Sequence, residues 1–542
     1  MRGVSGRAAV TGLVLAAVLL LGAAGSPTAV RVDQVGYRPR HPKVALVAAG
    51  PATFAVKDVR TGAVVFEGRA SPPAPPDPAS GDRVAALDFT PLVTPGAYTV
   101  TAAGADPSPP FAVAEDVYAG LFRAVLRVFP SQRCGVEIRD GSPWARPACH
   151  LRDAREWGGG PHRDVTGGWH DAGDYGKYVP AAGITIWHLA AVHDEAPAAW
   201  LRDELRWELD WMLRMQRSDG GVHHKVTNAR WTGNHAPHQD PDPRWLFGVT
   251  STATANLAAA GARAARLFRP HDAAYASRLL AAAEAAWQWL DRHPAIVPPG
   301  GFRNPPGVET GEYEDDDDRD ERFWAAAELW RTTGEARYRD AALAGLGRWT
   351  PFDYPPSWKG VQNLAYLGLI EAGSPLDPAA VARLRKELAE RSEWLLGAYA
   401  RIGYRVALAP GDYYTGSNGV ALGRAVQLLA AHRVTGRAAF RDAALDQVHY
   451  VLGRNVLGQS FVTGFGSNPV RRPTHQPSIT HPGRLALPGL MVGGPSAQPH
   501  GVQAAFPARA YRDDDAIWGV NEGAIYWQAA LAHVLAQLAA TD

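Results

Sequence analysis

The sequence predicts a small all-β sandwich followed by one large all-α domain. Short runs of β-branched and aromatic residues, separated by turn residues, occupy residues 29–113. From residue 114 onward, apolar residues recur at helical spacing. Of the 542 residues, 46% are hydrophobic and 20% are charged, so the chain can bury a sizeable core.

The β-type runs of the N-terminal region are interrupted by Gly and Pro turns, as is typical of a small sandwich. A Pro-rich stretch at 72–78 is expected to be a loop inside this module, because the strand pattern resumes after it. The expected strands cover residues 30–33, 43–47, 53–56, 64–66, 84–89 and 98–101.

The helical region is Ala-rich, which favours helix. Apolar residues recur at i+4 from Val117 to Phe129. The further expected helices cover residues 201–212, 252–268, 274–292, 321–331, 381–396, 420–434, 438–452 and 524–538. No fixed-period repeat supports a solenoid.

The N-terminus resembles a secretory signal. Arg2 and Arg7 precede an apolar run at 8–21, and small residues at 22–25 offer a cleavage site. We predict a cleaved signal over residues 1–25 and an exported chain without a membrane anchor; an uncleaved anchor is the alternative. The chain has 55 Lys and Arg residues and 54 Asp and Glu residues, so it has no excess of basic residues that would favour binding to nucleic acid.

Two segments carry carboxylates whose sequence surroundings are compatible with acid–base catalysis. The Gly-rich loop around Asp171 and Asp174 precedes an apolar helix, so one carboxylate could hold a water while the other takes its proton. Both could equally cap a turn. Glu522 is expected at the start of the last helix, where the helix dipole favours a carboxylate. Alternatively, Glu522 is a general acid whose pKa is raised by the neighbouring Trp518.

Together, residues 164–179 and 511–529 resemble glycoside hydrolase family 9, the inverting cellulase family. The resemblance implies that Asp174 is the general base and that Asp171 helps to bind the water. It also implies that Glu522 is the general acid and that Asp513 is a substrate-binding residue. It also implies an (α/α)6 barrel over 114–542. Matching segments are also found at 416–418, 452–455 and 461–466, and residues 30–37 resemble the immunoglobulin-like module that precedes many members.

Two clusters suggest metals. Cys134 and Cys149 are the only cysteines, and in an exported protein a disulfide is the plain interpretation. The family resemblance instead implies a structural zinc held by Cys134, Cys149, His150 and His170. The acidic run 314–321 would repel itself unless a cation is present, and the resemblance implies calcium near Asp320 and Glu321. No organic cofactor is expected.

The chain departs from the family pattern at one substrate-binding segment. Thr474 and Gln476 stand where members carry His-x-Arg, and His475 lies between them. These three residues, with Trp518 and Tyr414, are the expected substrate contacts. Loss of two strong donors is expected to weaken the grip on a neutral glucosyl unit and to favour oligosaccharides or amino sugars.

The sequence therefore predicts an inverting hydrolase of β-1,4-glucosidic bonds in cellulose or related β-glucans, acting on a polysaccharide or oligosaccharide. An exo-acting β-glucosidase, cellobiohydrolase or exo-β-glucosaminidase of the same family is the alternative. A carbohydrate-binding protein without turnover is the third, and the retained Asp171, Asp174 and Glu522 argue against it.

Overall fold

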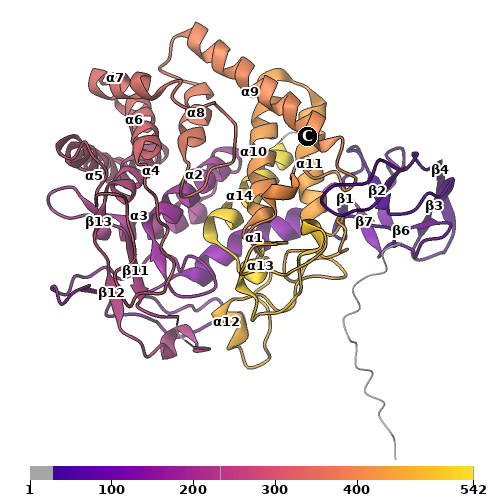
Figure 1. The fold of residues 1–542 in the computed structure, drawn as a ribbon, viewed down its shortest axis with the longest axis horizontal. Coiled ribbons are helices and arrows are strands. Elements are labelled where there is room, and N and C mark those ends of the chain that lie inside the picture. Colours follow the sequence, from indigo (N-terminus) through magenta and orange to yellow (C-terminus); the bar gives the residue numbers. More distant parts are fainter. Residues whose placement is uncertain (1–28, 232, 541–542) are drawn as a thin grey trace, which may run out of the picture.

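The computed structural model describes residues 29–231 and 233–540, in which a β-rich N-terminal module adjoins a much larger helical region (Figure 1). The expected signal segment, residues 1–25, lies outside the described residues. Of the helices in the described ranges, none combines the length and apolar character that a bilayer span needs.

The N-terminal module is the predicted sandwich. One sheet has the order β1-β7-β6-β3-β4 and the other pairs β2 with β5. Alternate side chains such as Val56 and Val100 from the first sheet pack with Val47 and Leu87 from the second in one buried cluster. The strands are β1 Gly36–Tyr37, β2 Val44–Val47, β3 Thr53–Asp58, β4 Val64–Arg69, β5 Ala85–Asp88, β6 Gly96–Ala102 and β7 Phe111–Val113.

The strand expected at 30–33 was wrong. Val30 and Val32 are buried in the sandwich core, but this segment makes only a single bridge, from Arg31 to Leu46. The chain turns at Asp33, because that carboxylate accepts the backbone amides of Val35 and Gly36 at 2.8 and 3.0 Å.

The helical region alternates between two sets of helices. The inner helices pack on one another in the series α10-α14-α2-α4-α6-α8, and each also contacts a chain neighbour from the outer set. The inner helices are α2 Val179–Glu195, α4 Ser251–Phe268, α6 Arg319–Thr333, α8 Gln362–Ile370, α10 Ser417–Thr435 and α14 Ile525–Ala540. The outer helices are α1 Ala119–Gln132, α3 Ala199–Met215, α5 Ala273–Arg292, α7 Ala336–Gly345, α9 Pro378–Tyr399 and α11 Ala438–Val451.

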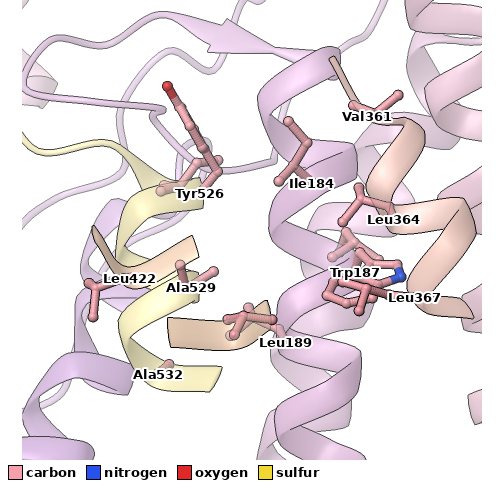
Figure 2. Close-up of a cluster of buried hydrophobic side chains, with 14 of the residues drawn as sticks. Ile184, Trp187, Leu189, Val361, Leu364, Leu367, Leu422, Tyr526, Ala529 and Ala532 are labelled. Atoms are coloured by element: carbon pink, nitrogen blue, oxygen red, sulfur yellow. The ribbon is translucent and has the colours of Figure 1, made fainter. Parts of the chain in front are cut away.

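Nearly every residue of an inner helix such as α2 or α8 is buried. In Figure 2, Trp187 of α2 lies beside Leu364 and Leu367 of α8. A helix buried on all sides has no polar face, so it shows no 3.6-residue hydrophobic period. Periodicity therefore gave no bounds for α2 and did not predict α8. The short outer helix α7, most of whose residues are exposed, was also not predicted.

Short elements connect the helices, and several surround the ends of the inner helices. The strands β8, β12, β11 and β9 form one small sheet, and β10 pairs with β13. These elements are β8 Arg155–Glu156, β9 Lys177–Tyr178, β10 Val222–His223, β11 Lys225–Asn228, β12 Arg244–Leu246, β13 Val249–Thr250, α12 Gln476–Ile479 and α13 Trp518–Asn521, with 3-10 turns at Pro237–Gln239, Pro410–Asp412 and Pro507–Arg509.

The C-terminal ends of the inner helices enclose a cavity of about 590 Å³. Most of the arginines that line it pair with carboxylates: Arg331 lies 2.8 Å from Glu371, and Arg266 and Arg433 pair with Glu328 and Glu195. Arg385 instead donates to the carbonyl of Ile370 at 2.8 Å. Arginine near helix C-termini also offsets the helix dipoles. This end of the helical region is therefore a network of ion pairs. Its cavity is larger than the cleft of about 250 Å³ described below, but its charged side chains are largely engaged with one another.

The two parts of the chain meet through a buried polar contact. Oδ2 of Asp33 accepts hydrogen bonds from the Tyr118 hydroxyl at 2.9 Å and from Nδ1 of His449 at 2.8 Å. Gln34 donates to the carbonyl of Gly458 at 2.8 Å. Buried polar groups without partners cost folding free energy, so these contacts fix how the sandwich sits on the helices.

Candidate active site

The loop that precedes α2 carries Asp171 and Asp174. The amide of Asp171 donates to the carbonyl of Gly176 at 2.8 Å, and the amide of Gly176 donates to Oδ2 of Asp174 at 3.1 Å. Gly173 leaves no room for a side chain, because a Cβ there would lie 2.0 Å from the carbonyl oxygen of Thr474. This close approach lets the Gly173 amide donate to Oε1 of Glu522 at 3.2 Å.

Glu522 was predicted at the start of the last helix, and the structure corrects this position. It lies between α13 and α14 with extended backbone, at φ −78° and ψ 142°, and α14 begins at Ile525. The amide of Ile525, in the first turn of α14, instead donates to the carbonyl of Asp171 at 2.8 Å. The last helix therefore anchors the loop of the other two carboxylates.

Asp171, Asp174 and Glu522 line a single cleft of about 250 Å³. Two tryptophans at its margin are well exposed, Trp231 at 53% and Trp518 at 42%. Trp518 stacks on His500 with ring centroids 4.7 Å apart. The aromatic lining comprises Tyr178, Trp231, Tyr313, Trp358, Trp518, Tyr526 and Trp527. Flat aromatic faces beside carboxylates suit the apolar faces and hydroxyls of sugar rings.

Tyr414 lies behind the cleft, in a smaller adjoining cavity that shares Trp358 and Tyr526 with it. Its hydroxyl is 2.8 Å from that of Tyr354. The structure therefore places Tyr414 in contact with other protein groups rather than at the cleft surface.

Tyr313 fixes the orientation of Asp171. Its hydroxyl donates to Oδ2 of Asp171 at 2.5 Å, while Oδ1 of Asp171 is buried without a protein partner. Burial raises the pKa of Asp171 to about 7, against the opposing effect of the Tyr313 hydrogen bond. The unpartnered Oδ1 is an acceptor that a water molecule could satisfy.

The three carboxyl groups hold protons with different strength. Burial, together with the negative charge of Asp174, raises the pKa of Glu522 well above its ordinary value. Burial also raises the pKa of Asp174, but the Gly176 amide and the charges of Arg244 and Lys225 act in the opposite direction. Glu522 is thus the group that keeps its proton, and Asp174 is the one that can ionise beside it.

A cluster of four potential metal ligands lies next to the loop that carries Asp171 and Asp174. Its members are Cys134, Cys149, His150 and His170. One potential ligand atom from each lies within 4.8 Å of the others. Both cysteines are buried free thiols. Nδ1 of His150 faces Sγ of Cys134 at 3.5 Å, and its Nε2 lies 3.2 Å from Asp240. A hydrogen bond with Cys134, and after it the charge of Arg146, lowers the pKa of Cys149 to about 6 against the effect of burial, which favours a thiolate.

A second cluster joins Asp315 to the predicted pair Asp320 and Glu321 at the start of α6. Both carboxylate oxygens of Glu321 and Oδ2 of Asp315 are buried without a hydrogen-bond partner. Burial and mutual repulsion raise the pKa of Asp315 to about 7 and that of Glu321 well above its ordinary value. Orphaned oxygen ligands of this kind fit a hard cation.

Comparison with known proteins agrees with this geometry. The profile of glycosyl hydrolase family 9 matches residues 118–535, and that of a cellulase N-terminal Ig-like domain matches residues 26–107. The chain belongs to glycosyl hydrolase family 9.

Individual relatives cover most of the chain. Endoglucanase D of Acetivibrio thermocellus is 33% identical over 94% of this chain and 83% of its own length. The cellodextrinase of Butyrivibrio fibrisolvens is 31% identical over 93% of this chain and 98% of its own. A metagenome-derived family 9 endoglucanase has a crystal structure that superimposes with a TM-score of 0.89, at 37% identity, covering 94% of this chain and 99% of that one.

In this family 9 chain, the segment 474–476 contacts backbone rather than the cleft. Thr474 forms a parallel bridge with Glu522, and its hydroxyl donates to the carbonyl of Asp515 at 2.8 Å. The amide of Gln476 donates to Gly173 at 2.7 Å, while Oε1 of Gln476 is buried without a partner.

His475 is not brought into the cleft. It is 1% exposed, and its ring nitrogens lie 2.8 Å from the Ser478 hydroxyl and 3.1 Å from Oε1 of Gln132. The side-chain Nε2 of Gln132 in turn donates to the carbonyl of Ala172 at 2.8 Å, in the loop that carries Asp171 and Asp174. His475 therefore supports that loop through Gln132.

Asp513 also lies outside the cleft lining. Its two carboxylate oxygens each accept one backbone amide, from Arg471 and Arg472, at 2.9 Å. These bonds tie the segment before Thr474 to the segment before Glu522.

The contact of Tyr313 with Asp171 was not predicted from the sequence. Their hydroxyl–carboxylate bond joins positions 142 residues apart, and no local spacing signals it. The cleft-lining Glu312, Tyr526 and Trp527 were missed for the same reason.

Replacing Tyr313 by Phe tests the orientation of Asp171. The lost hydrogen bond favours the carboxylate, so its removal should raise the pKa of Asp171 further and move the acidic limb of kcat/KM to higher pH. We also expect kcat to fall between about 10-fold and about 100-fold, because a water held by Asp171 would lose its orientation. The measurement is the pH dependence of kcat/KM on a soluble β-1,4-glucan.

Tyr366→Phe is the matched control, because it removes a hydroxyl that bonds only backbone groups of Gly347 and Trp349. Its pH profile should equal that of the wild type. An unshifted acidic limb in Tyr313→Phe would show that the titration of Asp171 in the free enzyme does not set this limb.

Proposed function

We propose that this enzyme hydrolyses β-1,4-glucosidic bonds of cellulose or related β-glucans with inversion. The observation that carries the proposal is the placement of Asp174 and Glu522 in one cleft, linked through the Gly173 amide, with environments that favour a proton on Glu522. Relatives named endoglucanase and cellodextrinase support a β-glucan substrate.

In the proposed reaction, protonated Glu522 donates its proton to the glycosidic oxygen as the bond to the anomeric carbon breaks. Asp174 accepts a proton from a water that attacks that carbon from the opposite face. Inverting enzymes hold the two carboxyl groups about 6.5–9.5 Å apart so that this water fits between base and sugar. Asp171, oriented by Tyr313, holds the water through its free Oδ1.

The exposed faces of Trp231 and Trp518 are proposed as stacking platforms for sugar rings. They lie at the margin of the same cleft and retain the exposed area that such contacts need. Polymeric chains and oligosaccharides could both use them, so endo- and exo-action are separated by product analysis.

The architecture and location are proposed as follows. Residues 1–25 are a signal that exports the chain, 29–113 the immunoglobulin-like module and 114–542 the catalytic domain. We propose that the inner and outer helices together form an (α/α)6 barrel, because inner helices pack on inner helices and each also packs on a neighbouring outer helix.

We propose a structural zinc on Cys134, Cys149, His150 and His170. Four nitrogen and sulfur donors suit a closed tetrahedral site, and the contact from Asp240 to the far nitrogen of His150 is typical of a ligand histidine. When bound, zinc would hold the loop of Asp171 in place. A structural calcium on Asp315, Asp320 and Glu321 would in the same way relieve repulsion among buried carboxylates.

A second candidate substrate is a β-1,4-linked glucosamine chain. Five carboxyl groups line the cleft, those of Asp171, Asp174, Glu312, Glu314 and Glu522, and none of its described lining residues is Lys, Arg or His. A cationic amino sugar would meet attraction from this lining, reduced by the pairing of Glu314 with Lys359 at 2.6 Å and of Glu312 with Arg303 at 3.8 Å.

Glu522→Gln and Asp174→Asn test the acid and the base. Each should lower kcat between about 100-fold and about 10,000-fold, the usual contribution of general acid–base catalysis. NMR of fresh product should show the inverted anomer. Asp164→Asn, an exposed carboxylate at the start of the same loop, should retain full activity. Retention of anomeric configuration would refute the mechanism.

Metal analysis tests the zinc cluster. We expect about one zinc per chain and two free thiols after denaturation with chelator, because four such ligands form one closed site. Chelation should lower the thermal stability more than it lowers kcat of the surviving folded enzyme. Finding neither zinc nor free thiols would establish a disulfide instead.

Comparing cello-oligosaccharides with glucosamine oligomers tests the second substrate. If the acidic lining selects the cation, Glu314→Gln should lower kcat/KM on glucosamine oligomers by about fivefold, since an exposed charge pair contributes at most about 1 kcal/mol. Turnover of cello-oligosaccharides should change less. Absence of wild-type turnover on glucosamine oligomers would exclude this candidate.

A further inference from the structure

A buried lysine crosslinks the two arms of the catalytic loop. Lys177 is 0% exposed and lies in β9, on the arm that leaves the loop. Its Nζ donates to the carbonyls of Gly167 at 2.8 Å and Val165 at 3.1 Å, on the arm that enters the loop. Asp171 and Asp174 lie between these two arms.

The third contact of the same ammonium is with Asp153, a residue that lies next to the four-residue Cys–His cluster. Nζ of Lys177 lies 2.7 Å from Oδ2 of Asp153, which is itself 3.9 Å from Sγ of Cys134. Arg244 also binds Asp153, with its Nε 2.8 Å from Oδ1. Asp153 is therefore compensated by Arg244 even without Lys177.

The three acceptors match the chemistry of an ammonium group. Lysine has three N–H donors on one atom, and here one carboxylate and two carbonyls surround that atom. A guanidinium is planar and spreads its donors over three nitrogens, so arginine would not meet three acceptors around one point. The ring of Trp211 lies 5.6 Å from Nζ and covers a further side.

The arms are also held at other points, and the amide of Asp171 joins them near the tip of the loop by donating to the carbonyl of Gly176 at 2.8 Å. The amide of Trp169 donates to Oε2 of buried Glu208 at 2.6 Å, which fixes the entering arm to α3. Lys177 pairs with Val226 of β11, which fixes the leaving arm to the small sheet. The ammonium of Lys177 joins the two arms at the base of the loop, through Val165 and Gly167.

We propose that Lys177 is a positioning residue for the reaction, which sets the separation of the loop arms and thereby the placement of Asp171 and Asp174 relative to Glu522. The inference rests on the proposed function of that site. Lys177 does not line the cleft and contacts no reacting group. It acts on catalysis through Val165 and Gly167.

Lys177→Met tests the proposal, with Lys43→Met as the matched control. Lys43 is likewise 0% exposed and donates to two backbone carbonyls, those of Pro39 and His41, but in the N-terminal module. Both variants should lose thermal stability. Only Lys177→Met should lose kcat, by about 100-fold, the effect of displacing catalytic groups by about 1 Å, with KM within about threefold of the wild type. Equal kcat in the two variants would overturn the proposal.

The double variant Asp153→Asn with Lys177→Met separates positioning from charge compensation. Stability should not recover, because buried Arg244 then loses Asp153 as its carboxylate partner, and kcat should stay low because Val165 and Gly167 remain unheld. Recovery of kcat would show that Lys177 only neutralises Asp153. Should Lys177→Met lose zinc, and added zinc restore kcat, the effect would run through the metal cluster and the proposal would fail.

Hydrogen–deuterium exchange keeps the test independent of turnover. In Lys177→Met, amides of residues 165–176 should exchange faster than in the wild type, and in Lys43→Met they should not. Unchanged exchange in this loop would overturn the proposal.

A wild-type enzyme with no β-glucan hydrolysis would refute the proposed function, while the exchange result would still decide whether Lys177 holds the two arms of the loop together. If Lys177→Met does not fold, Lys177→Arg provides the same comparison.

Discussion

The site depends on keeping three carboxyl groups together in one poorly solvated cleft. Asp171, Asp174 and Glu522 repel one another when ionised, and burial adds to the cost of each charge. The structure resolves this by giving the groups different partners. Tyr313 and backbone amides stabilise the aspartates, while the Glu522 carboxyl accepts a hydrogen bond from the Gly173 amide and has its pKa raised well above the ordinary value by burial. These different environments support the proposed roles of Glu522 as acid and Asp174 as base.

The helical scaffold brings these groups together from distant parts of the chain. Asp174 precedes α2 and Glu522 precedes α14, and these two inner helices pack side by side. Their N-terminal ends both face the loops of the cleft, where helix dipoles favour negative charge. The opposite ends carry the arginine–carboxylate network, so the two ends of the same helices are chemically distinct.

Much of the remaining structure limits movement of the loop at 165–178. Gln132 and the buried His475 support it from one side, and Glu208 holds Trp169 from another. The four-residue Cys–His cluster includes His170, which directly precedes Asp171. A close approach such as that of Gly173 to Thr474 tolerates little displacement, which explains why so many contacts converge on one short segment.

The sequence alone predicted the two-part organisation, most of the long helices, the carboxylates proposed as acid and base, and the Cys–His cluster. Local periodicity and short motifs carry that information. It misplaced Glu522 in a helix and placed His475 and Tyr414 at the substrate. It also had no means of finding the bonds of Tyr313 to Asp171 or of Lys177 to Val165 and Gly167. Helices buried on all sides, such as α8, lose the amphipathic period. Contacts between residues far apart in the chain depend on how the helices pack, so only the tertiary structure decided which polar groups meet.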